Sequence, residues 1–458
     1  MTVAMAFKES DLNSPEKREK HKISVIGCGR IGLATACLFS EVNFKVACFS
    51  PDPYVIQQIN SARNFFNRHE LGEMLKRNLS SGRLKATTNS KEALHESDII
   101  ILAAEIPING GKHPVYSSLE EMCRDIGLNL QPGSLIIVQS IMPPSITENL
   151  IIKTLERSSG LEAGVDFGLA YSPVDAPIGA EIEYLKERAR VISAINEQSL
   201  RAAESLLQVI TRGEFIEVRD IKTAEAAVLF GEVYRDVARA LSNELALLCE
   251  KMKIDYLAAQ KAANKQSSCH LFSPSLEGEK LSETPYLLIS EAADLGVKLR
   301  IISLARKLNN EASRQVYSLI KDAMHSCEKT VKRSKIAVLG VSLFCGTKEA
   351  RGSQILELVR LLRKRGGRVS VFDPRFSARD LSQMGFPSEK NLEKTVERAD
   401  CLVFTTACEE FKRLNLSRIR MLMRKPPAVV DLVHIVDPER AEKEGFIYRG
   451  LGRGVWKR

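Results

Sequence analysis

The stretch Lys22–Gly32, KISVIGCGRIG, decides the fold of the N-terminal part of the chain. A short apolar run leads into three glycines with the spacing GxGxxG, and an apolar helical stretch, LATACLFSEV, follows at once. A strand that passes into a helix through such glycines places the helix N-terminus where it can hold a pyrophosphate. We therefore expect an α/β fold that opens with a nucleotide-binding turn.

Further apolar runs follow this start, and helical patterns separate them. They include FKVACF, SDIIILAAE and GSLIIVQS, with shorter runs at residues 168–172 and 190–193 as the last strands. Strands that alternate with helices predict a parallel, doubly wound sheet. A second pattern of the same kind begins at KIAVLG, residues 335–340, and continues through RVSVFD, DCLVFTT and AVVDLV. The sequence thus predicts two doubly wound, Rossmann-like domains.

One long helix is expected between them, from Thr223 to Lys253. Its apolar residues recur at intervals of three and four: Ala226, Leu229, Phe230, Val233, Val237, Leu241, Leu245 and Leu248. A helix of this length suits a connector and a dimer face. We divide the chain into a flexible leader at 1–21, a dinucleotide-binding domain at 22–215, a helical dimerisation domain at 216–330 and a C-terminal domain at 331–458.

Composition narrows the class of protein. Hydrophobic residues make up 44% of the 458 residues and charged residues 27%, which is typical of soluble globular chains. No run approaches the roughly 18 apolar residues of a membrane span, and no signal peptide is apparent, so a cytoplasmic protein is expected. The ten cysteines form no CxxC pair, and no metal site is predicted. The net charge of +9 favours a small anionic ligand, whereas nucleic acid is not expected.

The glycine loop has three distinct roles. Gly27 permits the tight turn, Gly29 lets a pyrophosphate approach the backbone, and Gly32 lets the helix pack on the strand. The predicted cofactor-binding residues are Gly27, Cys28, Gly29, Arg30, Ile31, Gly32 and Ser50.

The acidic residue that holds the ribose of NAD should end the second strand, where the chain has Ser50. Either Asp52 substitutes from a shifted position, or recognition of the ribose is weakened. NAD is the expected cofactor, and NADP stays open because Ser50 would tolerate a 2′-phosphate.

The chain resembles the nucleotide-sugar 6-dehydrogenases, the family of UDP-glucose and UDP-N-acetylmannosamine dehydrogenases, over nearly all of residues 22–454. The stretches that carry the resemblance include SVIGCGRIGLATA, SIMPPSITE, YSPVDAPIG, YRDVARALSNELALLCEK, PYLLISEAADLGVKLRIISLARKLN, KIAVLGVSLFCGTKEARGS and GFIYRGLGRG. It implies an NAD-binding domain, a central dimerisation helix, a C-terminal domain that binds a UDP-sugar, and a homodimer. Family members oxidise a sugar alcohol to a carboxylate with two NAD.

The positions that the resemblance assigns to catalysis carry other residues. Lys280 stands where the family has its nucleophilic cysteine, and Thr284 where it has an aspartate. Val228 and Glu232 stand at the positions of a lysine and an asparagine on the long helix, and Val174 at that of a glutamate. No catalytic residue is therefore assigned.

Two further residues match the family, and the resemblance implies that they bind substrate: Tyr286 and Arg351. Three hypotheses stay open at this point. The chain is a pseudoenzyme that still binds a dinucleotide or a nucleotide-sugar, an NAD(P)-dependent oxidoreductase on a UDP-sugar or an altered substrate, or an ordinary UDP-sugar dehydrogenase.

Overall fold

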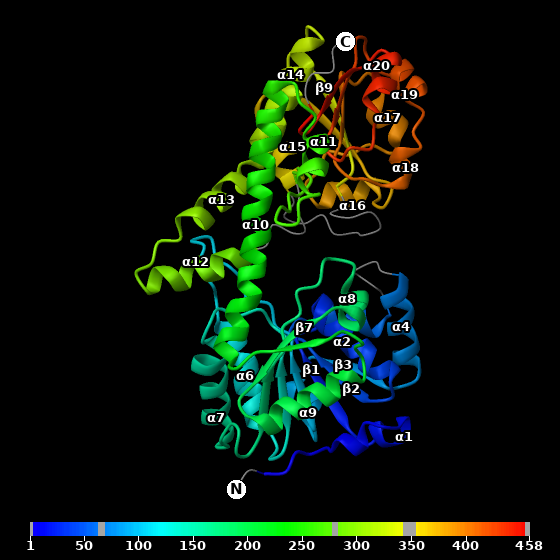
Figure 1. Cartoon of the computed structure of the whole chain (residues 1–458). Coiled ribbons are helices and arrows are strands. Elements are labelled where there is room, and N and C mark those ends of the chain that lie inside the picture. The colour runs from blue at the N-terminus through cyan, green and yellow to red at the C-terminus, as the bar shows by residue number, and fades with distance from the viewer. Residues whose placement is uncertain (1–2, 63–68, 277–282, 342–353, 454–458) are drawn as a thin grey trace. The chain divides into compact units, whose positions relative to one another are not determined.

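The computed structural model describes residues 3–62, 69–276, 283–341 and 354–453 (Figure 1). Two predicted site residues, Lys280 and Arg351, lie outside this part of the chain. The chain forms two compact units. Unit 1 comprises Met1–Val233 and Glu283–Lys298, and unit 2 comprises Tyr234–Ser282 and Leu299–Arg458.

Unit 1 is built on a sheet of eight strands in the order β3-β2-β1-β4-β5-β6-β7-β8. The strands are β1 (Lys22–Ile26), β2 (Lys45–Phe49), β3 (Leu84–Thr87), β4 (Ile99–Leu102), β5 (Leu135–Val138), β6 (Gly168–Tyr171), β7 (Arg190–Ala194) and β8 (Phe215–Glu217). The central strands β4 and β5 are buried at every position, which explains why their sequences are unbroken apolar runs.

Helices cover both faces of this sheet (Figure 1). The helices of unit 1 are η1 (Glu9–Asp11), α1 (Pro15–Arg18), α2 (Arg30–Glu41), α3 (Pro53–Asn60), α4 (His69–Ser80), α5 (Ser90–Leu94), α6 (Ser117–Asn129), the π-helix η2 (Thr147–Ile152), α7 (Lys153–Ser159), α8 (Glu181–Glu187), α9 (Glu197–Gln208) and α12 (Thr284–Asp294). The doubly wound architecture predicted from the sequence is confirmed.

Two expectations about this sheet are wrong. β7 pairs with β6 antiparallel, through Tyr171 and Ser193, so the sheet is not wholly parallel. The last strand is β8 rather than β7, and β3 was not anticipated at all. Both missed strands are short edge strands with partly exposed side chains. They therefore lack the apolar run that marks a strand buried on two faces.

Unit 2 contains a parallel sheet of five strands in the order β10-β9-β11-β12-β13. Its strands are β9 (Lys335–Leu339), β10 (Arg368–Phe372), β11 (Cys401–Phe404), β12 (Ala428–Asp431) and β13 (Ile447–Gly450). Its helices are α11 (Tyr256–Ala263), α13 (Arg300–Asn310), α14 (Ala312–Ser326), α15 (Gln354–Lys364), α16 (Ala378–Gln383), α17 (Leu392–Val396), α18 (Glu409–Lys412), α19 (Leu416–Leu422) and α20 (Pro438–Lys443).

The long helix is confirmed as α10 (Ile221–Met252), which begins in unit 1 and continues in unit 2. Its predicted apolar stripe divides between two faces. Leu229 and Val233 are buried, whereas Phe230, Leu241 and Leu248 are about half exposed. No helix among the described residues is long and apolar enough to cross a membrane.

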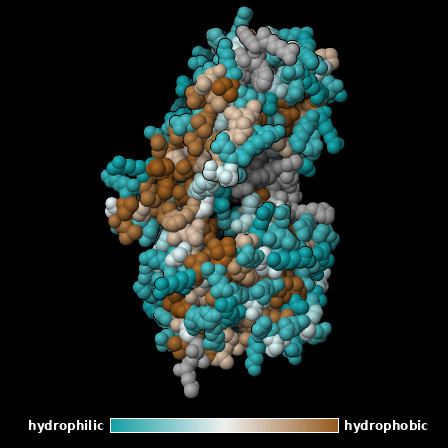
Figure 2. Space-filling model, in the orientation of Figure 1, coloured by the Kyte–Doolittle hydropathy of each residue, from teal (hydrophilic) through white to brown (hydrophobic). Residues whose placement is uncertain are grey.

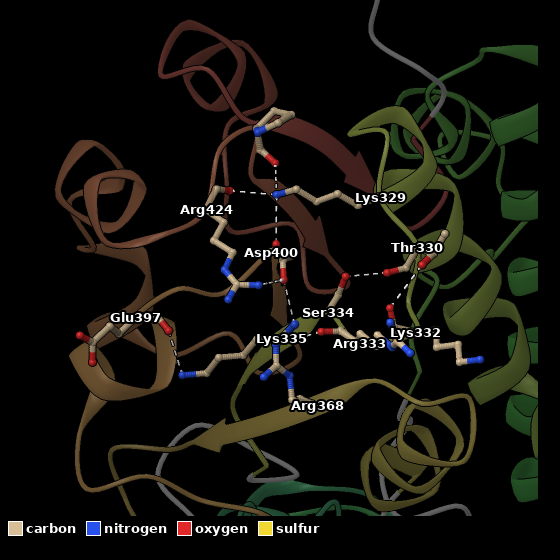
Figure 3. Close-up of polar contacts among 11 residues, drawn as sticks. Lys329, Thr330, Lys332, Arg333, Ser334, Lys335, Arg368, Glu397, Asp400 and Arg424 are labelled. Atoms are coloured by element: carbon tan, nitrogen blue, oxygen red, sulfur yellow. Dashed lines mark hydrogen bonds and ion pairs between the residues drawn. The ribbon is translucent and has the colours of Figure 1, made fainter.

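Both sheets are fixed at their amino edge by an aspartate that precedes a central strand. In unit 2 this residue is Asp400, directly before β11 (Figure 3). Its Oδ2 accepts a hydrogen bond from the N–H of Lys335 at 2.9 Å, and its Oδ1 lies 3.1 Å from the Lys329 ammonium. Its side chain is only 4% exposed, and Arg424 Nη1 approaches within 3.7 Å. The carboxylate therefore joins β9 and β11 where both strands begin.

Unit 1 repeats this arrangement with Asp98, directly before β4. Its Oδ2 accepts from the N–H of Lys22 at 3.2 Å and lies 3.0 Å from Nδ1 of His21. The two units also share a contact of the lysine at the start of β1 and of β9. Lys22 Nζ donates to the carbonyl oxygen of His95, and Lys335 Nζ to that of Glu397, each just beyond a short helix.

We predict that Asp400→Asn destabilises the protein by about 3 kcal/mol, because the Lys329 ammonium would lose its buried counterion. Urea denaturation measures the change. Glu397→Gln is the matched control, since its carboxylate pairs with Lys394 at the surface and its removal should leave the unfolding midpoint unchanged. Equal midpoints for both variants and the unmutated protein would contradict this role of Asp400.

Candidate dinucleotide site at the carboxyl edge of the unit 1 sheet

Two glycines of the loop are required by close contacts at the end of β1. Gly27 has a φ of +100°, and a Cβ there would lie 2.6 Å from the carbonyl oxygen of Ala103. A Cβ on Gly32, in the first turn of α2, would lie 1.9 Å from the carbonyl oxygen of Gly27. Both distances are far inside van der Waals contact. The turn and the packing of α2 on β1 therefore depend on the absence of side chains.

Gly29 differs, because the backbone around it is open. It is the N-cap of α2, and it has no side chain to accept from the first N–H groups of the helix. Among the described residues, and leaving aside its own neighbours in the chain, a Cβ at Gly29 would meet one atom within 4 Å, Oε1 of Glu105 at 3.7 Å. This space can hold a phosphate, and the first turn of α2 offers N–H donors without an intrahelical partner.

The other loop residues offer their backbone rather than their side chains. Cys28 is buried, with its Sγ 3.1 Å from the carbonyl oxygen of Phe49. The Arg30 guanidinium pairs with the carboxylate of Glu181 at 2.8 Å. The binding role of Cys28, Arg30 and Ile31 stays a prediction.

The end of β2 carries the residues expected beside the ribose. Ser50 is buried, and its Oγ accepts a hydrogen bond from the N–H of Asp52 at 3.3 Å. Asp52 is the N-cap of α3, and its Oδ1 accepts from the N–H of Tyr54 at 2.8 Å. One oxygen of the Asp52 carboxylate thus starts α3, and both alternatives for the recognition of the ribose stay predictions.

A buried glutamate that sequence reasoning missed joins α10 to this edge of the sheet. Glu225 accepts backbone hydrogen bonds from Ser145 at 2.6 Å and from Thr147 at 2.9 Å, in the segment after β5. Burial raises the pKa of Glu225 to about 7, although these two N–H donors oppose the shift. The sequence offered one signal of this buried carboxylate: Glu225 is the only acidic residue in the mainly apolar stretch TAEAAVLF, residues 223–230.

Three positions that the resemblance marks as catalytic lie in this region. Val228 and Glu232 follow Glu225 by three and seven residues, so they share its face of α10. Val174 is 4% exposed, belongs to the apolar core beside α2, and donates its N–H to the carbonyl oxygen of Gln139. Two of these three side chains can neither move a proton nor donate a hydrogen bond.

The remaining described candidates lie on α12. Thr284 is its first residue, and Tyr286 is buried with the Lys112 ammonium 5.1 Å from its ring centroid. His113 Nδ1 lies 3.3 Å from Oγ of Ser290, so the loop before α6 holds this helix. Tyr286 thus contributes to the packing of unit 1, and its role in binding substrate stays a prediction.

Comparison with known proteins identifies the family. Three models of the UDP-glucose/GDP-mannose dehydrogenase family match the chain: the NAD binding domain over residues 21–211, the central domain over 222–311 and the UDP binding domain over 337–438. The chain belongs to the UDP-glucose/GDP-mannose dehydrogenase family. NAD is accordingly the cofactor of this family member.

Individual relatives agree with this assignment. The UDP-N-acetyl-D-mannosamine dehydrogenase of Pyrococcus horikoshii is 32% identical over 436 residues, which cover 94% of this chain and 99% of the relative. A solved structure of the UDP-D-ManNAc dehydrogenase from that organism matches with a TM-score of 0.85 at 31% identity, over 95% of this chain and 100% of that one.

A second solved structure is the NDP-N-acetyl-D-galactosaminuronic acid dehydrogenase of Methanosarcina mazei. It matches with a TM-score of 0.77 at 27% identity, over 96% of this chain and 98% of that one. The fold and the family predicted from the sequence of the present chain are therefore confirmed.

We predict that Gly29→Val abolishes NAD binding while the fold survives, because the side chain would fill the open space beside α2. The loss of stability should be about 1 kcal/mol, as for a poor N-cap. Calorimetric titration with NAD and thermal unfolding measure the two effects.

Gly32→Ala is the contrasting variant. It should destabilise the whole of unit 1, because its Cβ would collide with the carbonyl oxygen of Gly27. Unchanged NAD affinity in Gly29→Val would contradict the placement of the pyrophosphate.

Proposed function

We propose that this chain binds NAD and a nucleotide-sugar but does not carry out the family's four-electron oxidation, and that it serves a regulatory or assembly role. The observation that carries the proposal is Val174. This residue stands at the family's glutamate position by resemblance, and its side chain is buried in an apolar core. A carboxylate that would handle protons and water is therefore replaced by a side chain that excludes both.

The chemistry of the second oxidation supports the same proposal. Hydride leaves only from a tetrahedral carbon, so a nucleophile must first add to the aldehyde, and the family uses a cysteine thiol for this addition. This chain has Lys280 at that position. Val228 offers no donor to a developing oxyanion, and Glu232 would bring a negative charge toward it if it faced the site. Loss of one such donor typically slows a reaction by about 10²–10³.

Binding is supported by separate features. The space beside Gly29 and the free N-terminus of α2 suit a pyrophosphate. The match to the family's UDP binding domain covers 337–438. Neither feature depends on the replaced positions, so ligand binding can persist after catalysis is lost.

A second candidate function is an NAD(P)-dependent two-electron oxidation of a UDP-sugar or an altered substrate. The near-complete match to a protein named UDP-N-acetyl-D-mannosamine dehydrogenase favours an oxidoreductase over a protein that only binds ligands. The two candidates differ in one measurable quantity, the number of NADH formed per sugar.

We predict no uronate from UDP-glucose, UDP-N-acetylglucosamine or UDP-N-acetylmannosamine with excess NAD. Lys280→Cys alone should not rescue activity, because Val174, Val228 and Glu232 would remain. Absorbance at the NADH band and mass spectrometry of the product measure the outcome, with the Pyrococcus horikoshii relative as the positive control. A uronate product from the unmutated protein would overturn the proposal, and one NADH per sugar would favour the second candidate.

We further propose that the protein is a homodimer joined through α10. Exposed apolar side chains follow one face of this helix at intervals of four and seven residues: Phe230, Tyr234, Leu241, Leu248 and Met252. In unit 2, α13 adds Ile301 and Leu304, which are also exposed. Figure 2 shows apolar surface gathered over α10 and α13. An apolar stripe with this spacing is suited to packing against a second helix.

We predict that the unmutated protein has the mass of a dimer in light scattering and that the double variant Leu241→Glu, Leu248→Glu is monomeric. The introduced carboxylates would have to be buried without partners in the interface. Met421→Glu is the control, because Met421 is 75% exposed on α19 and should not affect assembly. A monomeric unmutated protein would exclude the dimer.

A further inference from the structure

Segments rich in lysine and arginine meet at the amino edge of the unit 2 sheet. The strands of this sheet are all parallel, so the segments that lead into them lie at one edge. Four such segments, 328–334, 363–367, 397–400 and 423–427, lead into the neighbouring strands β9, β10, β11 and β12. Together they contain nine lysines and arginines and three acids. This edge therefore gathers positive charge from four separate parts of the chain.

Most of this charge is exposed and has no counterion within the protein. Lys329 is held by the buried Asp400, and the other eight cationic side chains are exposed: Lys332, Arg333, Arg363, Lys364, Arg365, Arg398, Arg424 and Lys425. Among the described residues, only Arg424 of these eight forms an ion pair, with Asp400 at 3.7 Å. The exposed acids of the four segments are Glu328 and Glu397. Figure 3 shows Arg333 and Arg424 near Asp400 at this edge.

The doubly wound fold does not require such an edge. Unit 1 has the same arrangement of an aspartate and a lysine at its amino edge. Its segments before β2, β4 and β5, residues 41–44, 95–98 and 131–134, nevertheless contain three acids and no lysine or arginine. The corresponding segments of unit 2, before β10, β11 and β12, contain six lysines and arginines and two acids. The positive charge is thus a property of the unit 2 surface.

An exposed methionine lies beside these cations. Met421, near the end of α19, is 75% exposed. The N–H of Arg398 donates to the carbonyl oxygen of Leu422 at 2.7 Å, so the end of α19 is held at the basic edge. An exposed apolar side chain among cations is suited to the boundary between lipid headgroups and acyl chains.

We propose that the amino edge of the unit 2 sheet docks on an anionic lipid membrane, with its cations against the headgroups and Met421 inserted below them. Each lysine or arginine near such a surface strengthens binding about fivefold. The outer two of the four strands lie about 14 Å apart, so one edge contacts several headgroups at once. A contact of this kind needs no membrane-spanning helix, and it is independent of the dinucleotide site in unit 1.

Nucleic acid is the other polyanion that a basic surface binds. The four segments contain no phenylalanine, tyrosine or tryptophan, so they lack the side chains on which the bases of a single strand stack. A duplex would be held through its phosphates alone, and this gives the exposed Met421 no role. Charge together with the apolar side chain favours the membrane.

The test is cosedimentation of the full chain with vesicles of phosphatidylcholine that contain about 30% phosphatidylserine. We expect binding at about 0.1 M salt, release at about 0.5 M salt because screening shortens the range of the attraction, and no binding to vesicles of phosphatidylcholine alone. Absence of binding to the anionic vesicles at the lower salt concentration would overturn the proposal and leave the proposed function intact.

Paired variants separate a docking surface from a general effect of net charge. Lys364→Gln combined with Lys425→Gln should weaken vesicle binding about 25-fold. Arg379→Gln combined with Arg413→Gln is the matched control, because these exposed residues follow β10 and β11 at the opposite edge and their replacement changes the net charge equally. Equal weakening by the two double variants would contradict docking through the amino edge.

Met421→Ser distinguishes the membrane from nucleic acid. It should weaken vesicle binding about tenfold, because the apolar side chain no longer leaves water, and it should leave binding to a DNA duplex unchanged. Unchanged vesicle binding by this variant, or tighter binding of the unmutated protein to the duplex than to the anionic vesicles, would overturn the membrane as the partner.

Discussion

The contact between Gly32 and the carbonyl oxygen of Gly27 is the constraint on which the dinucleotide site depends. A methyl group at position 32 would lie 1.9 Å from that oxygen, so α2 reaches the end of β1 only because the side chain is absent. This contact fixes the position of the first turn of α2 and the direction of its N–H groups. Ala103, at the end of the neighbouring β4, is held against the same turn.

Scaffold and chemistry have separate physical requirements in this family member. At the carboxyl edge, the side-chain carboxylate of Glu225 accepts hydrogen bonds from the N–H groups of Ser145 and Thr147. Those contacts survive whatever side chains stand at positions 174 and 228. Catalysis, in contrast, needs hydrogen-bond donors and proton-transfer groups at defined positions, and a valine side chain provides neither. The contacts that hold this edge of the sheet are therefore independent of the side chains at the positions that the resemblance marks as catalytic.

Sequence patterns predicted what depends on local chemistry. The glycine spacing and the long helical periodicity each reflect a rule that acts over a few residues, and both were confirmed. The edge strands β3 and β8 were not predicted, because only a strand buried on both faces leaves a continuous apolar run in the sequence, and these two strands are partly exposed.

Tertiary contacts over long separations in the chain were also beyond reach. Glu225 accepts hydrogen bonds from N–H groups about eighty residues away in the sequence, a contact that no local pattern reveals. The two faces of α10 were merged into one stripe because residues 229 and 230 are neighbours in sequence but point in different directions.

Unit 1 is discontinuous, and this has a consequence for the order in which the protein folds. Its sheet is complete once Glu217 has been synthesised, yet α12 comes from Glu283–Lys298, after the first part of unit 2 has already been made. Until then Lys112 and His113 lack the partners Tyr286 and Ser290. On the ribosome, some seventy more residues must therefore be synthesised after the sheet is complete before α12 can pack against Lys112 and His113.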